Sequence, residues 1–374
     1  MFKVFLLMNP VYAALFWALV LNFQKNSSIP KSFLGKFMIV SFVLYLSHFL
    51  YFTGQLEVYF YMDSIYTLTS LLVYPLIHIY VRLLTIDKTF TISLHGKYLF
   101  LPFLLFVLHF AGYLVMDKNQ AMHYLIHVLP GHSVEEGVSF YMLMIYQLFR
   151  IAFIVQAIVY LYFNYRLISR HNKRLMDFYS NMETRNLNWV LLFNFLLAIA
   201  SFSSIALAIL ERGLFLEKNL GLLFPSLIFS TMLFMAGFLG NIQGETNWHN
   251  DAQKEKFSKN NPVHPGLKDK LDNLFEKEKI FANSDLKIWD LCSALGTNRT
   301  YVSRIINQEY GRNFCNHVNF YRVSHARKLI KENPELDNND VAELSGFGSV
   351  NSLYRAFHFF EGKSLGEFKK MSGS

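Results

Sequence analysis

The sequence predicts an all-α protein in two parts: a bundle of membrane-spanning helices, followed by a smaller water-soluble helical domain. Long apolar, Phe-rich stretches fill residues 1–243, whereas residues 266–374 are polar and charged, with short segments of helical periodicity. The polar, Asn-rich residues 244–265 between them indicate a cytoplasmic linker. Across 374 residues the hydrophobic fraction is 53%, and only 17% of the residues are charged. Such a composition is unusual for a wholly soluble protein.

Seven stretches of the first part are long and apolar enough to cross a hydrocarbon core of ~30 Å, which takes roughly 20 helical residues. The third stretch holds Asp63, Pro75 and His78, which interrupt its apolar pattern. The first is not a signal peptide by its pattern, because Pro10 interrupts a long apolar run and no small-residue cleavage site precedes Gln24. The predicted spans are 4–23, 36–54, 63–84, 98–116, 140–163, 189–210 and 220–241.

The distribution of Lys and Arg between the spans predicts the orientation of the bundle. Loops after the first, third and fifth spans hold 11 such residues, and loops after the second, fourth and sixth hold 3. Positive loops face the cytoplasm, so the N-terminus is expected outside. An odd number of spans then delivers the C-terminal part to the cytoplasm, at the inner membrane. An even number would put that part on the side away from DNA.

Net charge and cysteine usage say little about partners. The formal net charge is +8, but from Pro262 to Ser374 there are 16 Lys and Arg against 14 Asp and Glu. The excess therefore belongs mostly to the loops between spans, and is not by itself a sign of DNA binding. Cys292 and Cys315 lack the spacing of a metal site, and are expected to be reduced thiols of a cytosolic domain.

Polar residues inside the predicted spans form a candidate sensor. Arg150 lies midway along the fifth span, Tyr146 and Gln147 lie one turn earlier on the same face, and Asn194 lies in the sixth span. Two interpretations stay open. The residues bind a small-molecule or membrane-derived signal, or they form interhelical hydrogen bonds that hold the bundle together. The same alternatives apply to polar residues in the second and third spans: His48, Tyr74 and His78.

No catalytic or metal-binding pattern is present in the sequence of the first part. It holds no paired carboxylates and no nucleophile next to a base, so an enzyme is not expected. No cofactor and no metal are expected either. The outside loop 117–139 is rich in His and Glu, but these residues are dispersed and are interpreted as solvated positions: His123, His127, His132, Glu135 and Glu136.

A tandem pattern dominates the second part. From Asn298 and from Ser349 the offsets match, with an apolar residue at +4, an arginine at +6 and an apolar residue at +8. Gly296 and Gly346 precede them, and glycine can adopt the left-handed conformation that ends a helix. Asn and Ser are good N-caps for the helix that follows. This is the plan of two helix-turn-helix units, at about 286–307 and 338–359, whose second helix enters the major groove of DNA.

Residues spread over both units match a known family. They are Leu286, Leu291, Gly296, Asn298 to Arg304, Gly311 to Phe314, Tyr321, Arg322, Ala326, Leu329, Val341, Ala342, Gly346, Phe347, Ser349, Arg355, Phe357 and Gly362. Through them the stretch from about Leu267 to Met371 resembles the DNA-binding domain of the AraC/XylS family of bacterial transcription regulators. The resemblance covers a little under a third of the chain, and it is most specific in the second unit.

Three residues depart from the family pattern. Leu365 stands where the family usually has proline, His358 where lysine is common, and Lys287 where a Ser or Thr caps the helix. The first and third affect local stability, and the second weakens one phosphate contact. None removes a feature on which the fold depends.

The resemblance implies which side chains contact DNA. The base-reading positions fall on Thr300, Ser303, Arg304, Val350, Asn351, Tyr354 and Arg355. The phosphate-contacting positions fall on Asn298, Arg299 and Ser349. Arginine can bridge guanine O6 and N7, and asparagine can bridge adenine N6 and N7. The alternative for Arg304 and Arg355 is a surface salt bridge, and for Tyr354 it is packing against the backbone. Arg322 is assigned to a structural ion pair.

Together these features predict a membrane-bound, sequence-specific transcription regulator of AraC type, with the bundle as its sensor. The expected partners are double-stranded DNA, the lipid bilayer, a signal molecule and a second copy of the chain, with RNA polymerase added by the resemblance. One rival interpretation is a transporter or membrane enzyme with an accessory DNA-binding domain. Another is a regulator that is constitutively anchored and binds no ligand.

Overall fold

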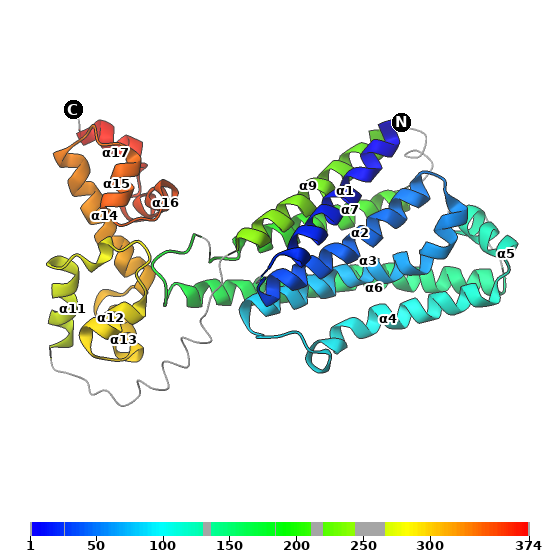
Figure 1. The fold of residues 1–374 in the computed structure, drawn as a ribbon, viewed down its shortest axis with the longest axis horizontal. Helices are drawn as coiled ribbons and strands as arrows, with labels where there is room; N and C mark the ends of the chain where they lie inside the picture. Colours follow the sequence, from blue (N-terminus) through cyan, green and yellow to red (C-terminus); the bar gives the residue numbers. More distant parts are fainter. Residues whose placement is uncertain are drawn as a thin grey trace. The chain divides into compact units, whose positions relative to one another are not determined.

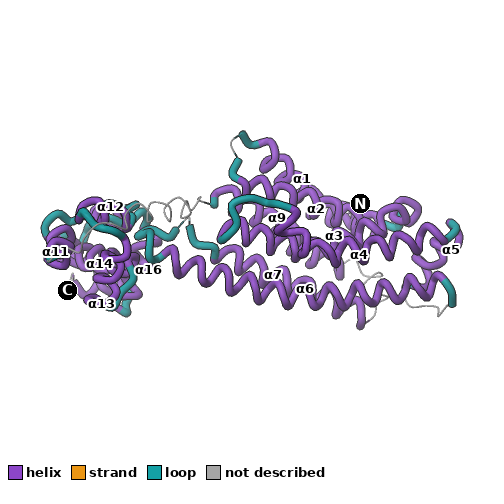
Figure 2. The backbone as a smooth tube through the Cα atoms, turned by 90° about the horizontal axis from the view of Figure 1, so that it is seen from below, coloured by secondary structure: helices purple, strands orange, loops and turns teal. Residues whose placement is uncertain are grey.

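The structure, a computed structural model, is helical almost throughout. It describes residues 2–25, 27–129, 136–183, 185–210, 220–243 and 266–372. Over these residues the only extended pairing is an isolated bridge between Tyr179 and Lys287, so the predicted all-α class is confirmed. Internal contacts divide the chain into two compact units (Figures 1 and 2). The first contains 1–169 and 187–243, and the second contains 170–186 and 244–374.

Long helices form the first unit, and each predicted span lies on one of them. They are α1 (Phe2–Phe23), α2 (Ile29–Phe52), α3 (Leu56–Thr85), α4 (Ile92–Val115), α6 (Val138–Leu175), α7 (Asn188–Leu210) and α9 (Leu220–Ile242). Six of them, all except α7, are long and apolar enough to cross a membrane. In α7 the apolar stretch among the described residues covers only Asn188–Phe202, which is shorter. The structure therefore supports six candidate spans.

The surface and interior of this unit match a lipid environment. Helix α1 packs along α2 and α9, α2 packs along α3, and α3 packs along α4 (Figure 1). Trp17, Phe37 and Tyr74 are buried in the core, while large side chains such as Phe23 and Leu114 are exposed. Helices that satisfy their own backbone hydrogen bonds and expose apolar side chains are suited to a bilayer.

The described part of the loop 117–139 contains helical structure that its polar sequence does not indicate. Helix α5 (Lys118–His123) begins at an Asp117 cap, and one π-helical turn (Tyr124–Val128) follows it. Tyr124 and Leu125 are buried against the ends of the neighbouring helices. His132 and Glu135 lie outside the described residues. Among the residues that are described, no group of three His, Cys, Asp or Glu side chains could hold a metal ion.

The second unit contains a row of short helices around two small cores. They are α11 (Leu267–Glu276), α12 (Ile288–Leu295), α13 (Arg299–Tyr310), α14 (Phe314–Glu332), α15 (Asn338–Leu344), α16 (Val350–Glu361) and α17 (Leu365–Ser372). One core joins α11, α12 and α13 to the start of α14, and the other joins α15, α16 and α17 to its end. The predicted linker 244–265 lies outside the described residues.

Residues 170–186, between α6 and α7, fold as part of the second unit. Leu175, Phe178 and Tyr179 are buried in its first core. Backbone hydrogen bonds also hold the segment, from Ser180 N to Leu286 O at 3.1 Å and from Ile288 N to Phe178 O at 3.0 Å. The sequence analysis treated this segment only as a positively charged loop, and did not anticipate that it docks there.

Candidate nucleic-acid interface and membrane cavity

The first helix pair, α12 and α13, is joined by a tight turn. Gly296 adopts the left-handed conformation with φ of 62°, and its N–H bonds back to the end of α12. The Asn298 side chain then accepts a hydrogen bond from Tyr301 N at 3.2 Å, which caps α13. Val302 and Ile306 are fully buried against α12. The predicted cap and the two predicted apolar positions are therefore all observed.

The second pair, α15 and α16, repeats this geometry in a more crowded setting. Gly346 has φ of 82°, and a Cβ atom there would collide with the carbonyl oxygen of Phe281. Ser349 Oγ accepts from Ser352 N at 3.1 Å and caps α16. Leu353, at +4 from the cap, is fully buried, as is the apolar residue at +8. Only glycine fits this turn, because the backbone conformation and the neighbouring chain both exclude a side chain.

The predicted base-reading side chains lie on the outward face of α13 and α16. Thr300, Arg304, Asn351, Tyr354 and Arg355 are exposed, and Ser303 and Val350 are half-buried. The guanidinium of Arg304 lies 5.7 Å from the Tyr301 ring centre and forms no ion pair with any described residue. The hydroxyl of Tyr354 accepts a hydrogen bond from Asn338 Nδ2 at 3.0 Å.

Arg355 differs from Arg304 because it has an acidic neighbour. Its Nη2 lies 3.6 Å from Oε1 of Glu183, which belongs to the segment between α6 and α7. The same carboxylate accepts a hydrogen bond from Ser349 Oγ at 2.8 Å, so a predicted phosphate-contacting residue is also engaged. Arg299, another such residue, places its guanidinium 4.6 Å from the Phe178 ring centre. Sequence reasoning missed both contacts.

Arg322 is structural, but its partners are not those expected of an ion pair. Its side chain is 1% exposed and donates to Phe281 O at 2.8 Å, Asn283 O at 2.7 Å and Ser180 Oγ at 3.0 Å. Burial lowers the pKa of Arg322 to about 10, which still leaves it charged at neutral pH. The assignment to an ion pair is replaced by carbonyl and hydroxyl acceptors, which satisfy a buried guanidinium without a carboxylate.

The remaining distinctive residues of this unit have local explanations. Lys287 cannot accept a hydrogen bond, but Asp290 accepts from its N–H at 2.8 Å and so supports the start of α12. Leu365 is buried in the second core at the start of α17, and His358 is exposed. Cys292 is a buried free thiol, as is Cys315, whose pKa burial raises to about 11. Neither thiol is therefore placed to react readily.

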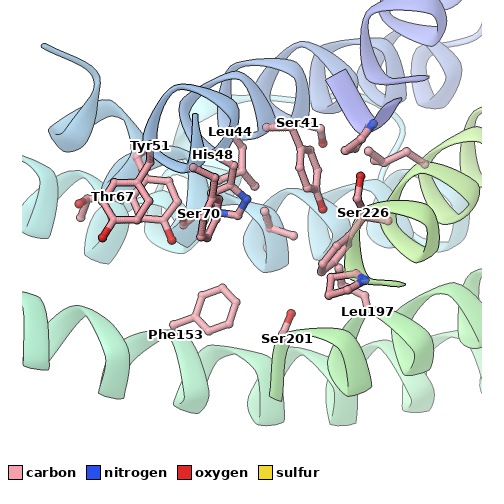
Figure 3. Close-up of a pocket in the computed structure, with 18 of the residues that line it drawn as sticks. Ser41, Leu44, His48, Tyr51, Thr67, Ser70, Phe153, Leu197, Ser201 and Ser226 are labelled. Carbon is pink, nitrogen blue, oxygen red and sulfur yellow. The ribbon is translucent and has the colours of Figure 1, made fainter. Parts of the chain in front are cut away.

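A cavity of about 370 Å³ lies inside the first unit, between α2 and α3 on one side and α6, α7 and α9 on the others (Figure 3). Its wall is mostly aromatic and aliphatic, with scattered hydroxyl groups such as Ser41, Ser70 and Ser201 (Figure 3). Of the four candidate sensor residues, Tyr146 and Arg150 line it. A largely apolar, concave space with a few polar groups is typical of a small-molecule site.

The other two candidate sensor residues do not line the cavity. Gln147 is exposed, although its Oε1 lies 3.4 Å from Arg150 Nη1. Asn194 is buried in a separate network, where its Oδ1 accepts from Asn164 Nδ2 at 2.9 Å and Asn164 Oδ1 contacts His78 Nδ1 at 2.7 Å. The single polar cluster considered in the sequence analysis is thus divided between two places in the bundle.

A third polar network surrounds Asp63, which the sequence analysis noted only as an interruption of a span. Asp63 accepts hydrogen bonds from Tyr59 Oη at 2.7 Å and Tyr113 Oη at 2.6 Å. His109 Nε2 lies 3.6 Å from the same carboxylate. Asp63 and Tyr59 also line the cavity. A buried carboxylate in an apolar span was the signal for this network, but its partners on α4 could not be read from the sequence.

Comparisons with known proteins concern the C-terminal part of the chain. No protein of curated function and no solved structure matches the chain. Residues 291–371, a little over a fifth of the sequence, match a family model described as a helix-turn-helix domain. The match begins inside α12 and continues into α17, so it includes both glycine turns and both outward-facing helices. The C-terminal part of the chain is thus an AraC-type helix-turn-helix domain, which supports DNA binding and a role in transcription regulation.

Proposed function

We propose that this chain is a membrane-bound, sequence-specific transcription regulator. The observation that carries the proposal is that the helix-turn-helix match falls on helices whose exposed side chains can hydrogen-bond to base edges. Arg304 and Arg355 suit guanine, and Asn351 suits adenine. Ser303 and Thr300 add hydroxyl groups beside Arg304, and Val350 and Tyr354 extend the same surface on α16.

Two reading helices on one domain are expected to enter successive major grooves, ~34 Å or ~10 base pairs apart. The residues at the N-termini of these helices, Asn298, Arg299 and Ser349, then contact phosphates and fix the register. In this proposal α12 with α13 and α15 with α16 are two separate helix-turn-helix units.

We propose that all seven long helices of the first unit cross the membrane, with the N-terminus outside. Trp189 Nε1 donates to Gln243 Oε1 at 2.7 Å, so α7 starts and α9 ends at the same end of the bundle. The segment before α7 and the chain after α9 both continue into the second unit. An antiparallel pair of crossings by α7 and α9 satisfies both requirements and agrees with the charge of the loops.

We propose further that the bundle senses a molecule through its cavity. Arg150 brings a cation to a wall that is mostly aromatic and aliphatic, and its guanidinium lies 5.9 Å from the Tyr146 ring centre. The Asp63 carboxylate in the same wall already accepts hydrogen bonds from Tyr59 and Tyr113. A molecule with an apolar body and one acidic group complements this wall. Enzyme and transporter interpretations have no comparable observation in their favour among the residues that the structure describes.

The topology is tested with reporter fusions in the full chain. A reporter that is active only in the cytoplasm should work after Ser374 and fail when inserted in the 117–139 loop. A reporter active only outside should give the opposite pattern. Cytoplasmic activity in the loop and none at the C-terminus would exclude DNA binding in the cell, and with it the proposed function.

The sensor is tested with Arg150→Gln. The change should alter the transcript profile of cells that express the chain by roughly fivefold or more at regulated genes, while the protein still inserts. Arg166→Gln is the matched control, because Arg166 also lies over a tyrosine four residues earlier, 5.6 Å from the Tyr162 ring centre, but does not line the cavity. Equal profiles for both variants and the wild type would leave the bundle as an anchor only.

A further inference from the structure

We propose that the segment 176–186, called here the arm, is an autoinhibitory element that covers the second DNA-reading helix. Its carboxylate at Glu183 occupies the phosphate-binding end of α16, and DNA must displace it to engage that helix. This inference rests on the proposed function and adds a mode of regulation to it.

The first half of the arm is built into the DNA-binding domain. Phe178 and Tyr179 are buried in the first core, and the arm pairs with residues 286–288 through two backbone hydrogen bonds. Cys315 N also donates to Met176 O at 2.8 Å. The buried Arg322 guanidinium needs the hydroxyl of Ser180 as one of its acceptors. This half of the arm is therefore a fixed part of the fold.

In the second half of the arm, the side chain of Glu183 contacts α16. Its carboxylate accepts from Ser349 Oγ at 2.8 Å and from Ser352 Oγ at 3.2 Å, and lies 3.6 Å from Arg355 Nη2. A helix N-terminus attracts anions because its first N–H groups are unpaired and its dipole is positive there. An oxygen anion at this place occupies the position proposed for a DNA phosphate.

The arm lies close to the N-terminus of α16, and contacts before and after Glu183 hold it there. A Cβ atom at Gly348 would lie 2.8 Å from Asn181 Nδ2, so the arm approaches the turn before α16 closely. Beyond Glu183, Arg185 Nη1 bonds to Asp285 Oδ1 at 2.9 Å and to Asn181 O at 3.1 Å. These contacts fix the end of the arm while Glu183 faces the reading helix.

The first reading helix is not covered in this way. Phe178 lies against Arg299, but no acidic side chain among the described residues pairs with Arg304. The arm therefore reaches α13 at its N-terminal end, where Phe178 lies against Arg299 and the Asp177 carboxylate interacts with the same charge, but it leaves Arg304 accessible, whereas at α16 it reaches Arg355. Ion pairs this exposed are individually weak, with Arg355 64% exposed and Glu183 30% exposed, so DNA can compete with the contact.

The arm is also the chain that joins two helices of the bundle. Helix α6 carries Arg150 and Tyr146 at the cavity and ends at Leu175 in the core of the DNA-binding domain. Helix α7 begins two residues after the arm ends. A change in the relative position of α6 and α7 would thus act on Glu183 through continuous chain, without a further signalling module. Release of Glu183 would expose Arg355 and the N-terminus of α16 together.

The test uses the full chain in lipid nanodiscs and a labelled pool of random duplexes of about 30 base pairs, long enough for two successive major grooves. Glu183→Gln keeps the size of the side chain and removes its charge. We expect it to bind the pool about tenfold more tightly than the wild type, with a steeper dependence on salt, because an anion no longer competes with phosphate. Glu278→Gln, an exposed acid of the same domain without an ion pair among the described residues, is the charge-matched control and should bind like the wild type.

A second variant separates inhibition from a purely structural role. Ser352→Ala removes one contact of Glu183 with α16 and should tighten binding in the same direction, about twofold, without lowering the melting temperature. Equal affinities for wild type and Glu183→Gln would overturn the inference and leave the proposed function intact. Loss of both affinity and melting temperature in Glu183→Gln would also overturn it, since the arm would then only stabilise the fold. Absence of binding by every folded variant would reject the proposed function itself.

Discussion

The two helix pairs of the DNA-binding domain follow one plan but differ in their surroundings. In both, a left-handed glycine and a polar cap precede a helix with buried residues at +4 and +8. On α13 the arm lies at the N-terminal end, where Phe178 meets Arg299, while Arg304 lies over the Tyr301 ring of its own helix and forms no ion pair with a described residue. The outward face of α16 meets Glu183, and its turn presses on the backbone of Phe281.

This difference separates what a local pattern determines from what the rest of the chain adds. The pattern sets the turn, the cap and the direction of the side chains in both pairs. The arm and the turn at Phe281 then act on one pair only. If both pairs read DNA as we propose, Arg304 of the first pair would be accessible without a change in the arm, and Arg355 of the second would become accessible when Glu183 is released.

The largest difference between the two pairs is expected in the stability that is lost when the turn glycine is replaced by alanine. Gly346→Ala should lower the free energy of unfolding by about 3–4 kcal/mol, because a left-handed alanine is strained and its Cβ meets Phe281 O. Gly296→Ala should cost only about 1 kcal/mol, because a Cβ atom there has open space within 4 Å. Denaturant unfolding of the detergent-solubilised chain compares them. Equal losses would mean that the second turn does not press against its neighbour.

The stability of the first core is expected to depend on pH, with a loss nearly as large as that of Gly346→Ala, and the second core is expected to lack this dependence. His317 is 0% exposed, packs against Phe275, Tyr310 and Tyr321, and neither ring nitrogen has a hydrogen-bond partner among the described residues. Burial, with a smaller contribution from Arg312, lowers the pKa of His317 from 6.5 to about 4. Between these values the unfolded chain binds the proton and the folded chain does not, so stability falls as the pH drops through this range.

The expected loss is about 3 kcal/mol from pH 6.5 to pH 4. His317→Phe should remove most of it, because a phenyl ring fits the same aromatic surroundings without titrating. Hydrogen exchange at the two pH values locates the effect, with α13 losing protection and α16 keeping it. An unchanged pH profile in His317→Phe would show that other groups cause the acid sensitivity.

The smallest difference is expected between Arg304 and Arg355, in the DNA affinity that is lost when each is replaced by alanine. This difference should depend on the arm. Arg304→Ala is expected to weaken binding to a preferred duplex by roughly 1–3 kcal/mol. Arg355→Ala should weaken it less, because the free protein also loses its contact with Glu183. In the Glu183→Gln background the two losses should become equal. Binding isotherms of the four variants measure this, and a persistent difference would mean that the arm does not cause it.

Much of the fold could be predicted because it depends on local patterns. Apolar length located every long helix of the first unit, and the spacing after Asn298 and Ser349 located the turns, caps and buried faces of the second. Helix α6 is longer than its predicted span because no Gly or Pro interrupts the polar residues that follow it. The pattern predicts seven spans, whereas the structure supports six, because the described apolar stretch of α7 is shorter.

The contacts that distinguish the two pairs could not be predicted, since they join distant parts of the chain. Glu183 and Ser349 are 166 residues apart, and nothing near either residue indicates the other. One signal was available, because Phe178 and Tyr179 are large apolar residues in a segment otherwise assigned to solvent. Similarly, a carboxylate inside a membrane span is energetically costly, so Asp63 indicated that polar partners lie nearby. Its partners Tyr113 and His109 were identified only by the fold.

The central claim, that this is a DNA reader with two separate reading helices held at the membrane, is tested most directly by selection of duplexes from a random pool. The nanodisc-embedded wild type, Arg304→Ala and Arg355→Ala would each be used, and the recovered duplexes sequenced. The account predicts two half-sites ~10 base pairs apart, with each variant losing base preference in a different half-site. Recovery of random sequences by the wild type, or a uniform loss of preference across both half-sites in each variant, would contradict it.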